Sequence, residues 1–381
     1  MVAIGEKRRI LTNVRRAIPG VRFYGYDFDP TPRNKISRDL WSAANALSRG
    51  RAAAICLKRL RSEGFSPDVV YGHPGWGEML HVKDVFPEAR VINYCEFYFN
   101  RDGQDYAYDP EFPDSDPDGF RIRTENMPQL VSMVAADAGI SPTPWQRSRY
   151  PALFQERISV LHDGIDLDIV KPDATAAVHL PGKSLTLTKA DQVLTYVSRN
   201  LEPYRGFHIF MRALPALLRR LPHAHVLIVG GDEVSYGRPP EAGTYREKYL
   251  AEVGPQLDMS RVHFMGRIAY IDYLRVLQIS TAHVYLTYPF VLSWSMLEAM
   301  GSGAAVIGSR TAPVEDVIDG GRNGLMVDFF SAEELVDTVV RVCGDNELRQ
   351  HLGRAAMQTV RERFDLRDLL PRQLEVLQRF A

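Results

Sequence analysis

Short apolar runs alternate with amphipathic stretches along most of this chain, and the alternation restricts the folds open to it. A short apolar run bounded by turn residues is typical of a buried strand, and an apolar stripe repeating every three to four residues is typical of a surface helix. Strands that alternate with helices indicate α/β units with parallel sheets. In the first half we expect strands at Val21–Tyr26, Asp68–Tyr71, Arg90–Tyr94, Gly139–Ile140 and Ile158–Leu161.

The same alternation starts again after residues 171–191, which have the composition of a linker. With 381 residues the chain is long enough for two domains, each with its own core. We predict an N-terminal domain over 1–172, a second domain over 173–360, and a C-terminal helix at 361–381 that crosses back to the first domain. The second domain should contain strands Val193–Ser198, His225–Val229, Val262–Met265, Ala282–Thr287 and Ala305–Ser309, and helices Phe207–Arg220, Tyr245–Glu252, Tyr270–Ile279 and Ser295–Ser302.

Two further segments of the first half carry local expectations. A helix should run from near Ser37 to Gly50, with Leu40, Trp41, Ala44 and Leu47 on its apolar face. Residues 100–120 contain too many Asp, Pro and Gly for a regular element, so we expect a long loop there.

Composition excludes several classes of protein. Hydrophobic residues make up 45% and charged residues 24% of the chain, which excludes global disorder. The net charge of −1 gives no argument for binding nucleic acid. Three scattered cysteines predict neither a disulfide framework nor a metal site. The first residues lack the apolar segment of a signal peptide, and we expect a cytoplasmic protein.

Charge is nevertheless unevenly distributed. Residues 1–65 hold 14 Lys and Arg against 5 Asp and Glu, whereas residues 84–126 hold 4 against 11. A basic N-terminal surface is suited to peripheral binding at the inner face of an anionic membrane. It is equally suited to binding a phosphorylated acceptor. An ordinary solvated surface has the same composition and stays the alternative.

The segment YVSRNLEPYRGF carries the first candidate site. A strand there ends at Arg199, and Arg205 directly precedes a glycine at the expected start of a helix. Guanidinium groups match phosphate oxygens in a bidentate manner, so this pair suits a diphosphate. Two solvated loop arginines are the alternative.

A second candidate site follows in LTYPFVLSWSMLEAMGSGAAVIGS. After a strand, a turn with Leu292, Ser293 and Ser295 opens a short helix that carries Glu298. Backbone N–H groups at such a helix start suit phosphate, and Glu298 one turn later suits ribose hydroxyls. A glutamate placed there by the helix dipole alone is the alternative.

These segments, in their order, resemble the C-terminal domain of the family-four (group 1) retaining glycosyltransferases of the GT-B superfamily. The segment SRNLEPYRG is similar to the phosphate motif of that family, and HVLIVGGDE is similar to its strand with a glycine turn. The segment VHFMGRIAY is similar to the segment that reads the base. The closing segments of the family are matched by LEAMGSGAAVIGS and APVEDVIDGGRNGLMVD. The resemblance implies two Rossmann-like doubly wound domains facing across a cleft. It also implies that Arg199 and Arg205 bind the diphosphate, that Gly231 and the main chain from Gly266 to Ile268 line the donor site, and that Glu298 binds ribose.

The first half resembles the N-terminal domain of the same family. SPDVVYGHPGWGE is similar to the strand that presents a histidine to the donor sugar, which implies that role for His73; a structural histidine in a His-Pro turn is the alternative. Glu96, in YCEFYFN, follows the next strand and is a candidate acceptor-side group. Its aromatic neighbours fit a packed cluster.

Two departures from the family pattern stand out. The usual pair of glutamates separated by seven residues requires a glutamate eight residues before Glu298, where this chain has Phe290. The N-terminal domain also shows no opening strand with a Gly-rich turn, since AIGEKRRI resembles the second strand region. We therefore expect that the first strand is missing, through a misassigned start or a true loss.

The resemblance implies transfer of a sugar from a nucleotide-sugar donor, a UDP- or GDP-sugar, with retention and without a metal or other cofactor. The acceptor, a glycan, a lipid-linked or a small molecule, is not identified. A nucleotide-sugar epimerase of the same fold would need acid and base carboxylates that are not visible here. A degenerate nucleotide-sugar-binding protein is the alternative, favoured by Phe290 and opposed by the intact set of Arg199, Arg205 and Glu298.

Overall fold

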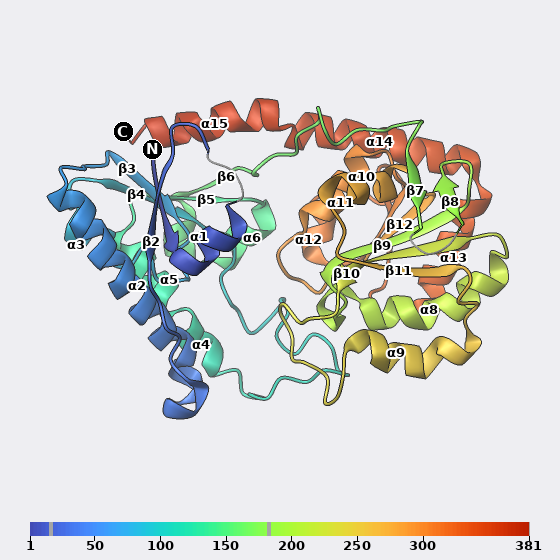
Figure 1. The fold of residues 1–381 in the computed structure, drawn as a ribbon, viewed down its shortest axis with the longest axis horizontal. Coiled ribbons are helices and arrows are strands. Elements are labelled where there is room, and N and C mark those ends of the chain that lie inside the picture. Colours follow the sequence, from blue (N-terminus) through green and yellow to red (C-terminus); the bar gives the residue numbers. More distant parts are fainter. Residues whose placement is uncertain (15–17, 181–183, 381) are drawn as a thin grey trace. The chain divides into compact units, whose positions relative to one another are not determined.

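The computed structural model describes residues 1–14, 18–180 and 184–380 and divides the chain into two compact units (Figure 1). The first unit comprises Met1–His162 together with Pro371–Ala381, and the second comprises Asp163–Leu370. The division after residue 162 lies ten residues before the predicted boundary at 172. Gln373 Nε2 donates to the carbonyl oxygen of His162 at 3.0 Å within the first unit.

The second unit is built on a six-stranded sheet in which every neighbouring pair is parallel. The strand order is β11-β10-β9-β12-β13-β14, so the chain starts in the middle, builds outward to one edge, and then crosses to build the other half. This is the doubly wound order, in which ligands bind beyond the carboxyl ends of the central strands. The strands are β9 (Val193–Asn200), β10 (His225–Gly231), β11 (Val262–Gly266), β12 (Ala282–Tyr285), β13 (Val306–Ser309) and β14 (Leu325–Val327).

Helices cover both faces of this sheet. On one face α8 contacts both α9 and α13, and on the other α11 contacts both α10 and α14 (Figure 1). The alternation of apolar runs and amphipathic stretches in the sequence has this origin, because strands covered on both faces are apolar throughout. The helices of this unit are α8 (Phe207–Arg220), α9 (Tyr245–Val253), α10 (Tyr270–Gln278), α11 (Trp294–Gly301), α12 (Ala312–Glu315), α13 (Ala332–Gly344) and α14 (Asn346–Phe364). The last helix, α15 (Leu366–Gln378), begins in this unit and ends in the first one.

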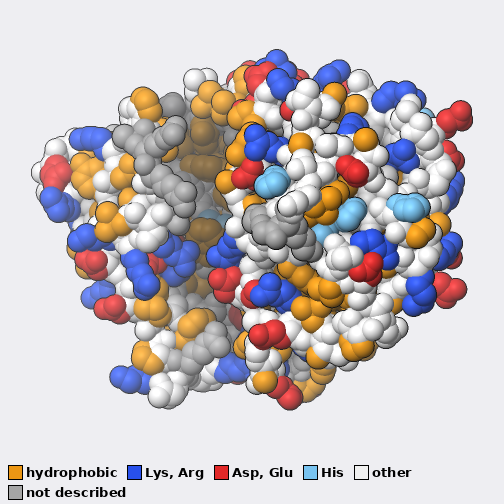
Figure 2. Space-filling model, turned by 45° about the vertical axis from the view of Figure 1, so that its right-hand side comes forward, with side chains coloured by type: hydrophobic (Ala, Val, Ile, Leu, Met, Phe, Trp, Pro, Cys, Tyr) orange, Lys and Arg blue, Asp and Glu red, His pale blue; other side chains and the backbone are white. Residues whose placement is uncertain are grey.

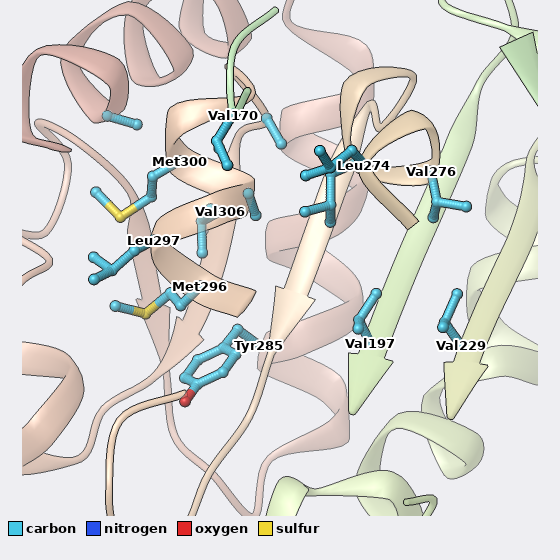
Figure 3. Packing of buried hydrophobic residues seen from close by; sticks show 14 of the residues in the cluster. Val170, Val197, Val229, Leu274, Val276, Tyr285, Met296, Leu297, Met300 and Val306 are labelled. Carbon is cyan, nitrogen blue, oxygen red and sulfur yellow. The ribbon is translucent and has the colours of Figure 1, made fainter. Parts of the chain in front are cut away.

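The core of the second unit packs between the sheet and helices α10 and α11. Figure 3 shows Leu274 of α10 and Met296 of α11 among valines of the neighbouring strands, all of them buried. Tyr285, at the end of β12, belongs to the same cluster, but its hydroxyl points away from the aliphatic side chains (Figure 3). The core thus ends in a polar group at the edge where ligands of such sheets bind.

The first unit has two separate groups of parallel strands. A four-stranded sheet has the order β3-β4-β5-β6, and β1 pairs with β2 in a two-stranded sheet. Among the described residues, β1 leads directly into α1 at Lys7 without a Gly-rich turn. The missing first strand stays an expectation, and the described strands of this unit do not form one continuous sheet. They are β1 (Val2–Glu6), β2 (Arg22–Tyr26), β3 (Val69–Gly72), β4 (Arg90–Tyr94), β5 (Ala138–Ser141) and β6 (Ile158–Val160).

The long helix α2 corrects two predictions. It extends over Arg38–Ser62 and does not end at Gly50, which is buried inside it. The predicted apolar face is also wrong, because Leu40 and Leu47 are 43% and 57% exposed. The buried face instead carries small residues, and a Cβ added at Gly50 would lie 2.6 Å from the carbonyl oxygen of Gly77. Close approach of another backbone, rather than a helix end, requires this glycine. The remaining helices of the unit are α1 (Lys7–Asn13), α3 (Val82–Val85), α4 (Arg121–Glu125), α5 (Met127–Ala135), α6 (Pro144–Arg149) and α7 (Ala152–Gln155).

The predicted loop and the predicted linker have different outcomes. Residues 101–120 contain no helix or strand, as expected. The linker, in contrast, contains an antiparallel pair of short strands, β7 (Ala177–His179) and β8 (Thr186–Thr188). Val178 and Leu187 of this pair are buried in the core of the second unit. These two strands were not predicted, because each is only three residues long and buries a single position.

Charged side chains of both signs are interspersed on the face seen in Figure 2. This agrees with the small net charge of the whole chain, −1.

Candidate functional site

Arg205 is anchored at the carboxyl end of the central strands of the second unit. It ends the short 3-10 helix η2 (Pro203–Arg205) and is only 8% exposed. Its guanidinium donates to the Tyr285 hydroxyl at 3.2 Å, to Thr287 Oγ1 at 2.7 Å and to the carbonyl oxygen of Val291 at 3.1 Å. A guanidinium has five N–H groups, so these three bonds fix its position and leave others for a ligand.

Arg199, the other predicted phosphate ligand, is placed differently. It lies near the end of β9 and is exposed. Among the described residues it makes no hydrogen bond or ion pair, unlike Arg205. The two arginines therefore differ: Arg205 is buried and held in place, whereas Arg199 is exposed and available to a ligand.

The Tyr285 hydroxyl connects Arg205 to the start of α11. It accepts a bond from the backbone N–H of Ser293 at 2.8 Å in addition to the one from Arg205. Burial raises the pKa of this hydroxyl, so it stays protonated. A cation and the N-terminus of a helix thus share one buried oxygen, and both attract anions.

The turn before α11 carries the remaining predicted phosphate-binding residues. Ser293 is the N-cap, and its hydroxyl accepts from the backbone N–H of Ser295 at 3.3 Å. The two serine hydroxyls lie 2.9 Å apart. Leu292 is buried at 5% exposure and belongs to the core cluster, so only its backbone is a candidate for ligand contact.

Glu298 is held by two tyrosines of α10 that the sequence analysis did not single out. Tyr270 donates to Oε1 at 2.7 Å, and Tyr273 donates to Oε2 at 2.5 Å. The whole residue is only 9% exposed. Burial, together with the hydrogen bond to Glu298, raises the pKa of both tyrosine hydroxyls, so both remain donors. Two tyrosines three residues apart at the start of a helix were the available sequence signal.

Gly231 and the segment around Gly266 are brought together by Arg267. Arg267 Nη2 donates to Glu233 Oε2 at 2.6 Å and to Asn200 Oδ1 at 2.9 Å. A Cβ added at Gly231 would lie 2.6 Å from Arg267 Nε, so this glycine makes room for the guanidinium. The same prediction included Ile268, which packs against the core cluster. The glycine turn and the predicted base-reading segment are therefore neighbours.

A buried carboxylate, Glu202, organises the loop after β10. It is 1% exposed and accepts bonds from the backbone N–H groups of Ser235, Tyr236 and Gly237 at 3.1 to 3.4 Å. Burial raises the pKa of the Glu202 carboxyl, and these N–H groups act in the opposite direction. Glu202 was not predicted, although it lies between the two predicted phosphate-binding arginines in the sequence.

Phe290, which replaces the expected glutamate, lies in an aromatic cluster beside Arg205. Its ring centroid is 4.9 Å from that of Tyr236 and 5.6 Å from that of Tyr204. The guanidinium carbon of Arg205 lies 5.8 Å from the Phe290 ring and 5.6 Å from the Tyr236 ring. Two aromatic rings therefore face the Arg205 cation at the position where the family pattern has a carboxylate.

In the first unit, His73 and Glu96 meet because they follow the adjacent parallel strands β3 and β4. His73 Nε2 lies 3.5 Å from Glu96 Oε2. Its Nδ1 accepts from the backbone N–H of Gly75 at 3.1 Å, which places the ring proton of a neutral imidazole on Nε2, facing the carboxylate. The imidazole also stacks on Trp76, with ring centroids 4.3 Å apart.

The aromatic neighbours of Glu96 form the packed cluster that the sequence analysis expected. Phe97 and Tyr98 are 6% and 9% exposed. Their rings contact those of Trp145 and Tyr150, respectively. They belong to the core rather than to a ligand site.

The described residues contain neither a metal-binding cluster nor a membrane-spanning helix. Within residues 1–14, 18–180 and 184–380, no group of three or more His, Cys, Asp or Glu side chains is arranged to hold a metal ion. In the same ranges, no helix is both long and apolar enough to span a membrane.

Comparison with known families and curated proteins gives consistent results. Residues 5–170 match the glycosyl transferase family 4 group, and residues 191–345 match glycosyl transferases group 1. The chain is 26% identical over 208 residues to a D-inositol 3-phosphate glycosyltransferase of Corynebacterium glutamicum, covering 54% of this chain and 48% of that protein. It is 28% identical over 202 residues to the Corynebacterium jeikeium enzyme of that name, covering 52% and 46%. The chain thus spans about half the length of these curated relatives.

Solved structures support the fold. A sucrose-phosphate synthase from Thermosynechococcus elongatus superposes with a TM-score of 0.70 at 18% identity, over 96% of this chain and 84% of that one. The Anabaena protein HepE, solved in complex with UDP-glucose, gives a TM-score of 0.64 at 15% identity, over 94% and 85%. The two family matches together cover most of the chain, and both units have the parallel Rossmann-like architecture. The chain belongs to the family 4, group 1 glycosyltransferase family and has the GT-B fold.

Proposed function

We propose that this glycosyltransferase takes a UDP- or GDP-sugar as donor and binds its diphosphate at the carboxyl end of the sheet in the second unit. The observation that carries the proposal is the Tyr285 hydroxyl, which bonds both to the guanidinium of Arg205 and to the N-terminus of α11. Two groups that attract anions are thereby fixed together before any ligand arrives. Preorganised donors of this kind stabilise a charge that develops during reaction.

The roles of the surrounding residues follow from their positions. Arg199 and Arg205 neutralise the diphosphate as it leaves the sugar, and the turn of Leu292, Ser293 and Ser295 at the start of α11 contacts its oxygens. Glu298 binds the ribose. The main chain from Gly266 to Ile268 contacts the base, and Gly231 lines the donor site. HepE, solved with UDP-glucose, supports a uridine nucleotide as the first donor to test.

Glu298 keeps the capacity to accept hydrogen bonds from ribose although two tyrosines already donate to it. A carboxylate has about four lone-pair positions, and Tyr270 and Tyr273 use one on each oxygen. Each oxygen therefore retains one position for a ribose hydroxyl. Glu298→Gln should weaken binding of the nucleoside part without changing the choice of sugar.

We further propose that transfer proceeds with retention and without a metal, with the departing diphosphate taking the acceptor proton. Arg199 and Arg205 supply the positive charge that a metal supplies in other transferases. The anomeric configuration of the product, read by proton NMR immediately after transfer, tests retention. Turnover that persists in EDTA tests independence from metals.

The acceptor belongs to the first unit in this proposal, where Glu96 and His73 are paired. A glycan, a lipid-linked molecule or a small molecule are the candidate acceptors, and nucleic acid is not among them. The enzyme acts in the cytoplasm, with peripheral contact of residues 1–65 to an anionic membrane. Binding to anionic vesicles that weakens with added salt tests this contact.

A nucleotide-sugar-binding protein with little catalysis is the second candidate, favoured by Phe290. Its ring packs between Tyr204 and Tyr236, where the family pattern has a glutamate that contacts the sugar. Incubation with UDP-glucose and a panel of acceptors, with UDP release followed by ion-exchange chromatography, separates the two. Release above the rate of spontaneous hydrolysis supports the transferase, whereas tight binding without release supports the binding protein.

A further inference from the structure

Two segments of the second unit that are distant in sequence meet at the guanidinium of Arg205. The first, η2 (Pro203–Arg205), carries the arginine itself and directly follows Glu202. The second is the loop of residues 232–244, which joins β10 to α9 and carries Tyr236. The Tyr236 ring centroid lies 5.6 Å from the guanidinium carbon of Arg205. Glu202 adjoins the first segment and binds the second with its side chain, so it connects the arginine to a ring that faces it.

The Glu202 carboxylate accepts hydrogen bonds from consecutive backbone N–H groups of this loop. Its Oε2 lies 3.1 Å from the backbone nitrogens of Ser235 and Tyr236, and 3.4 Å from that of Gly237. Its Oε1 lies 3.2 Å from the nitrogen of Ser235. Glu202 is buried, and a buried carboxylate is costly unless such donors satisfy it. Movement of the loop backbone at these residues would leave buried polar groups on both sides unpaired.

Further contacts anchor the loop on both sides of Tyr236. Asn200, the last residue of β9, donates from Nδ2 to Ser235 Oγ at 2.7 Å. On the other side, the Tyr245 hydroxyl donates to the carbonyl oxygen of Arg238 at 2.7 Å. The position of the Tyr236 ring is therefore determined by an anchored backbone, with Glu202 as the anchor directly at the tyrosine.

Tyr236 and Phe290 both face the guanidinium of Arg205, and Tyr204 packs against both of these rings. Tyr236 is the member of this group that comes from the loop of residues 232–244. Rings that cover a guanidinium restrict its rotation and exclude water from it. A charge in a water-poor environment acts more strongly on an anion, so the position of the Tyr236 ring affects how well Arg205 binds phosphate.

We propose that Glu202 is a positioning residue of the donor site, which acts on the nucleotide diphosphate through Tyr236 and Arg205. The proposal rests on the proposed function, because it requires that Arg205 binds the diphosphate. With 1% exposure, Glu202 does not reach the ligand itself. It fixes the loop that carries Tyr236, and the ring of Tyr236 keeps the guanidinium oriented for the phosphate oxygens. The backbone N–H groups of the loop stabilise the negative charge of Glu202, so a carboxylate supports a site for anions.

Isothermal titration calorimetry with UDP tests this role on the full chain. Glu202→Ala should bind UDP about fivefold more weakly than the wild type, the fold-change that corresponds to one lost cation–π contact. Tyr236→Leu should weaken binding by a similar factor, because it removes the ring directly. The double variant should bind UDP no more weakly than either single variant, since both changes remove the same contact. A glutamate that serves stability alone would not produce this coupling with Tyr236.

Conservative variants of Glu202 show whether its hydrogen bonds carry the effect. Glu202→Gln keeps an oxygen that can accept from the loop N–H groups as Oε2 does, so its UDP affinity should stay within about twofold of the wild type. Glu202→Asp keeps the charge but shortens the side chain by one methylene, so it should weaken UDP binding. It replaces Glu202→Ala in the double variant if the alanine variant does not fold.

Glu247→Ala is the matched control. Glu247 Oε2 accepts from the backbone N–H of Thr244 at 2.8 Å, so this exposed carboxylate also binds the backbone of the loop, but at its far end. The control should bind UDP as the wild type does, because Thr244 lies eight positions beyond Tyr236 in the sequence.

The wild-type titration separates this proposal from the proposed function. If the wild type binds UDP but Glu202→Ala or Tyr236→Leu binds it equally well, the positioning role is wrong and the donor site stands. The same conclusion follows if the two losses multiply in the double variant, or if Glu202→Gln binds as weakly as Glu202→Ala. If the wild type binds neither UDP nor GDP, the donor site fails and this proposal fails with it. A shared loss in Glu202→Ala and Tyr236→Leu, with wild-type affinity in Glu202→Gln and Glu247→Ala, supports both.

Discussion

Tyr273 donates its hydroxyl to Oε2 of Glu298 at 2.5 Å, from a helix that precedes the one carrying the glutamate. Tyr270 binds the other oxygen from the same helix. Glu298 was predicted from its place in α11 alone, but its orientation depends on α10. The position of the predicted ribose ligand is therefore set by two helices.

Tyr273→Phe should destabilise the protein by about 1–3 kcal/mol, because it leaves one oxygen of a buried carboxylate without its donor. Tyr270→Phe should cost less than about 1 kcal/mol, since Tyr270 is 52% exposed and water replaces its hydroxyl. Urea unfolding of the three proteins measures both differences. Equal costs in the two variants would contradict the different burial of the two hydrogen bonds.

Gly206→Ala should lower stability by more than about 2 kcal/mol. Gly206 has φ +69° at the start of α8, and a Cβ there would lie 2.4 Å from Leu286 Cβ. The left-handed backbone alone costs an L residue about 1–2 kcal/mol, and the clash adds to it. Gly254→Ala is the control, because its backbone is helical and a Cβ there meets nothing within 4 Å. Denaturant midpoints that fall alike in both variants would show that the Leu286 contact is unimportant.

Stability should fall as the pH drops from about 6.5 to 4, in part through His162. Burial lowers the pKa of His162 to about 4, and that of His283 to about 3. In this window the unfolded chain binds protons that the folded chain does not, so the stability present above pH 6.5 is lost as the pH falls. For His162 alone the loss reaches about 2 kcal/mol near pH 4.5.

His162→Gln removes this titration. Between pH 7 and pH 4.5 the free energy of unfolding of this variant should therefore fall by about 2 kcal/mol less than that of the wild type. Parallel curves for the two proteins over this range would mean that His162 titrates equally in the folded and unfolded chains.

The second unit was largely predictable, because its strands are buried on both faces and appear as apolar runs such as Val193–Ser198. The start of α11 was predictable too, because Ser293 is a residue type that caps helices and Glu298 follows it about one turn into the helix. The helix α2 was predicted less well. Its real buried face consists of small residues, among them Ala46 and Gly50, while the larger Leu40 and Leu47 face solvent. Side-chain size was a misleading guide where close backbone contact decides the packing.

The contacts that complete the site came from residues distant in sequence. Tyr285 ends β12, 80 positions after Arg205, and only the parallel pairing of β9 with β12 brings the two together. Glu202 looked like an ordinary loop residue, and its three backbone N–H donors lie 33 to 35 positions later. Such pairs depend on the tertiary fold and leave no local pattern in the sequence.

Binding of UDP to Arg199→Ala, measured by isothermal titration calorimetry, tests the account most directly. Arg199 is exposed and, within the described ranges, makes no hydrogen bond or ion pair, so its removal should leave the fold unchanged. Arg354→Ala, which removes another exposed arginine of the same unit, from α14, is the control. We expect the wild type and the control to bind UDP equally, and Arg199→Ala to bind it more weakly by about 1.5–3 kcal/mol, the worth of a hydrogen bond to a charged group. Equal affinity in all three proteins, or no binding of UDP or GDP by the wild type, would contradict a diphosphate site at the carboxyl end of this sheet.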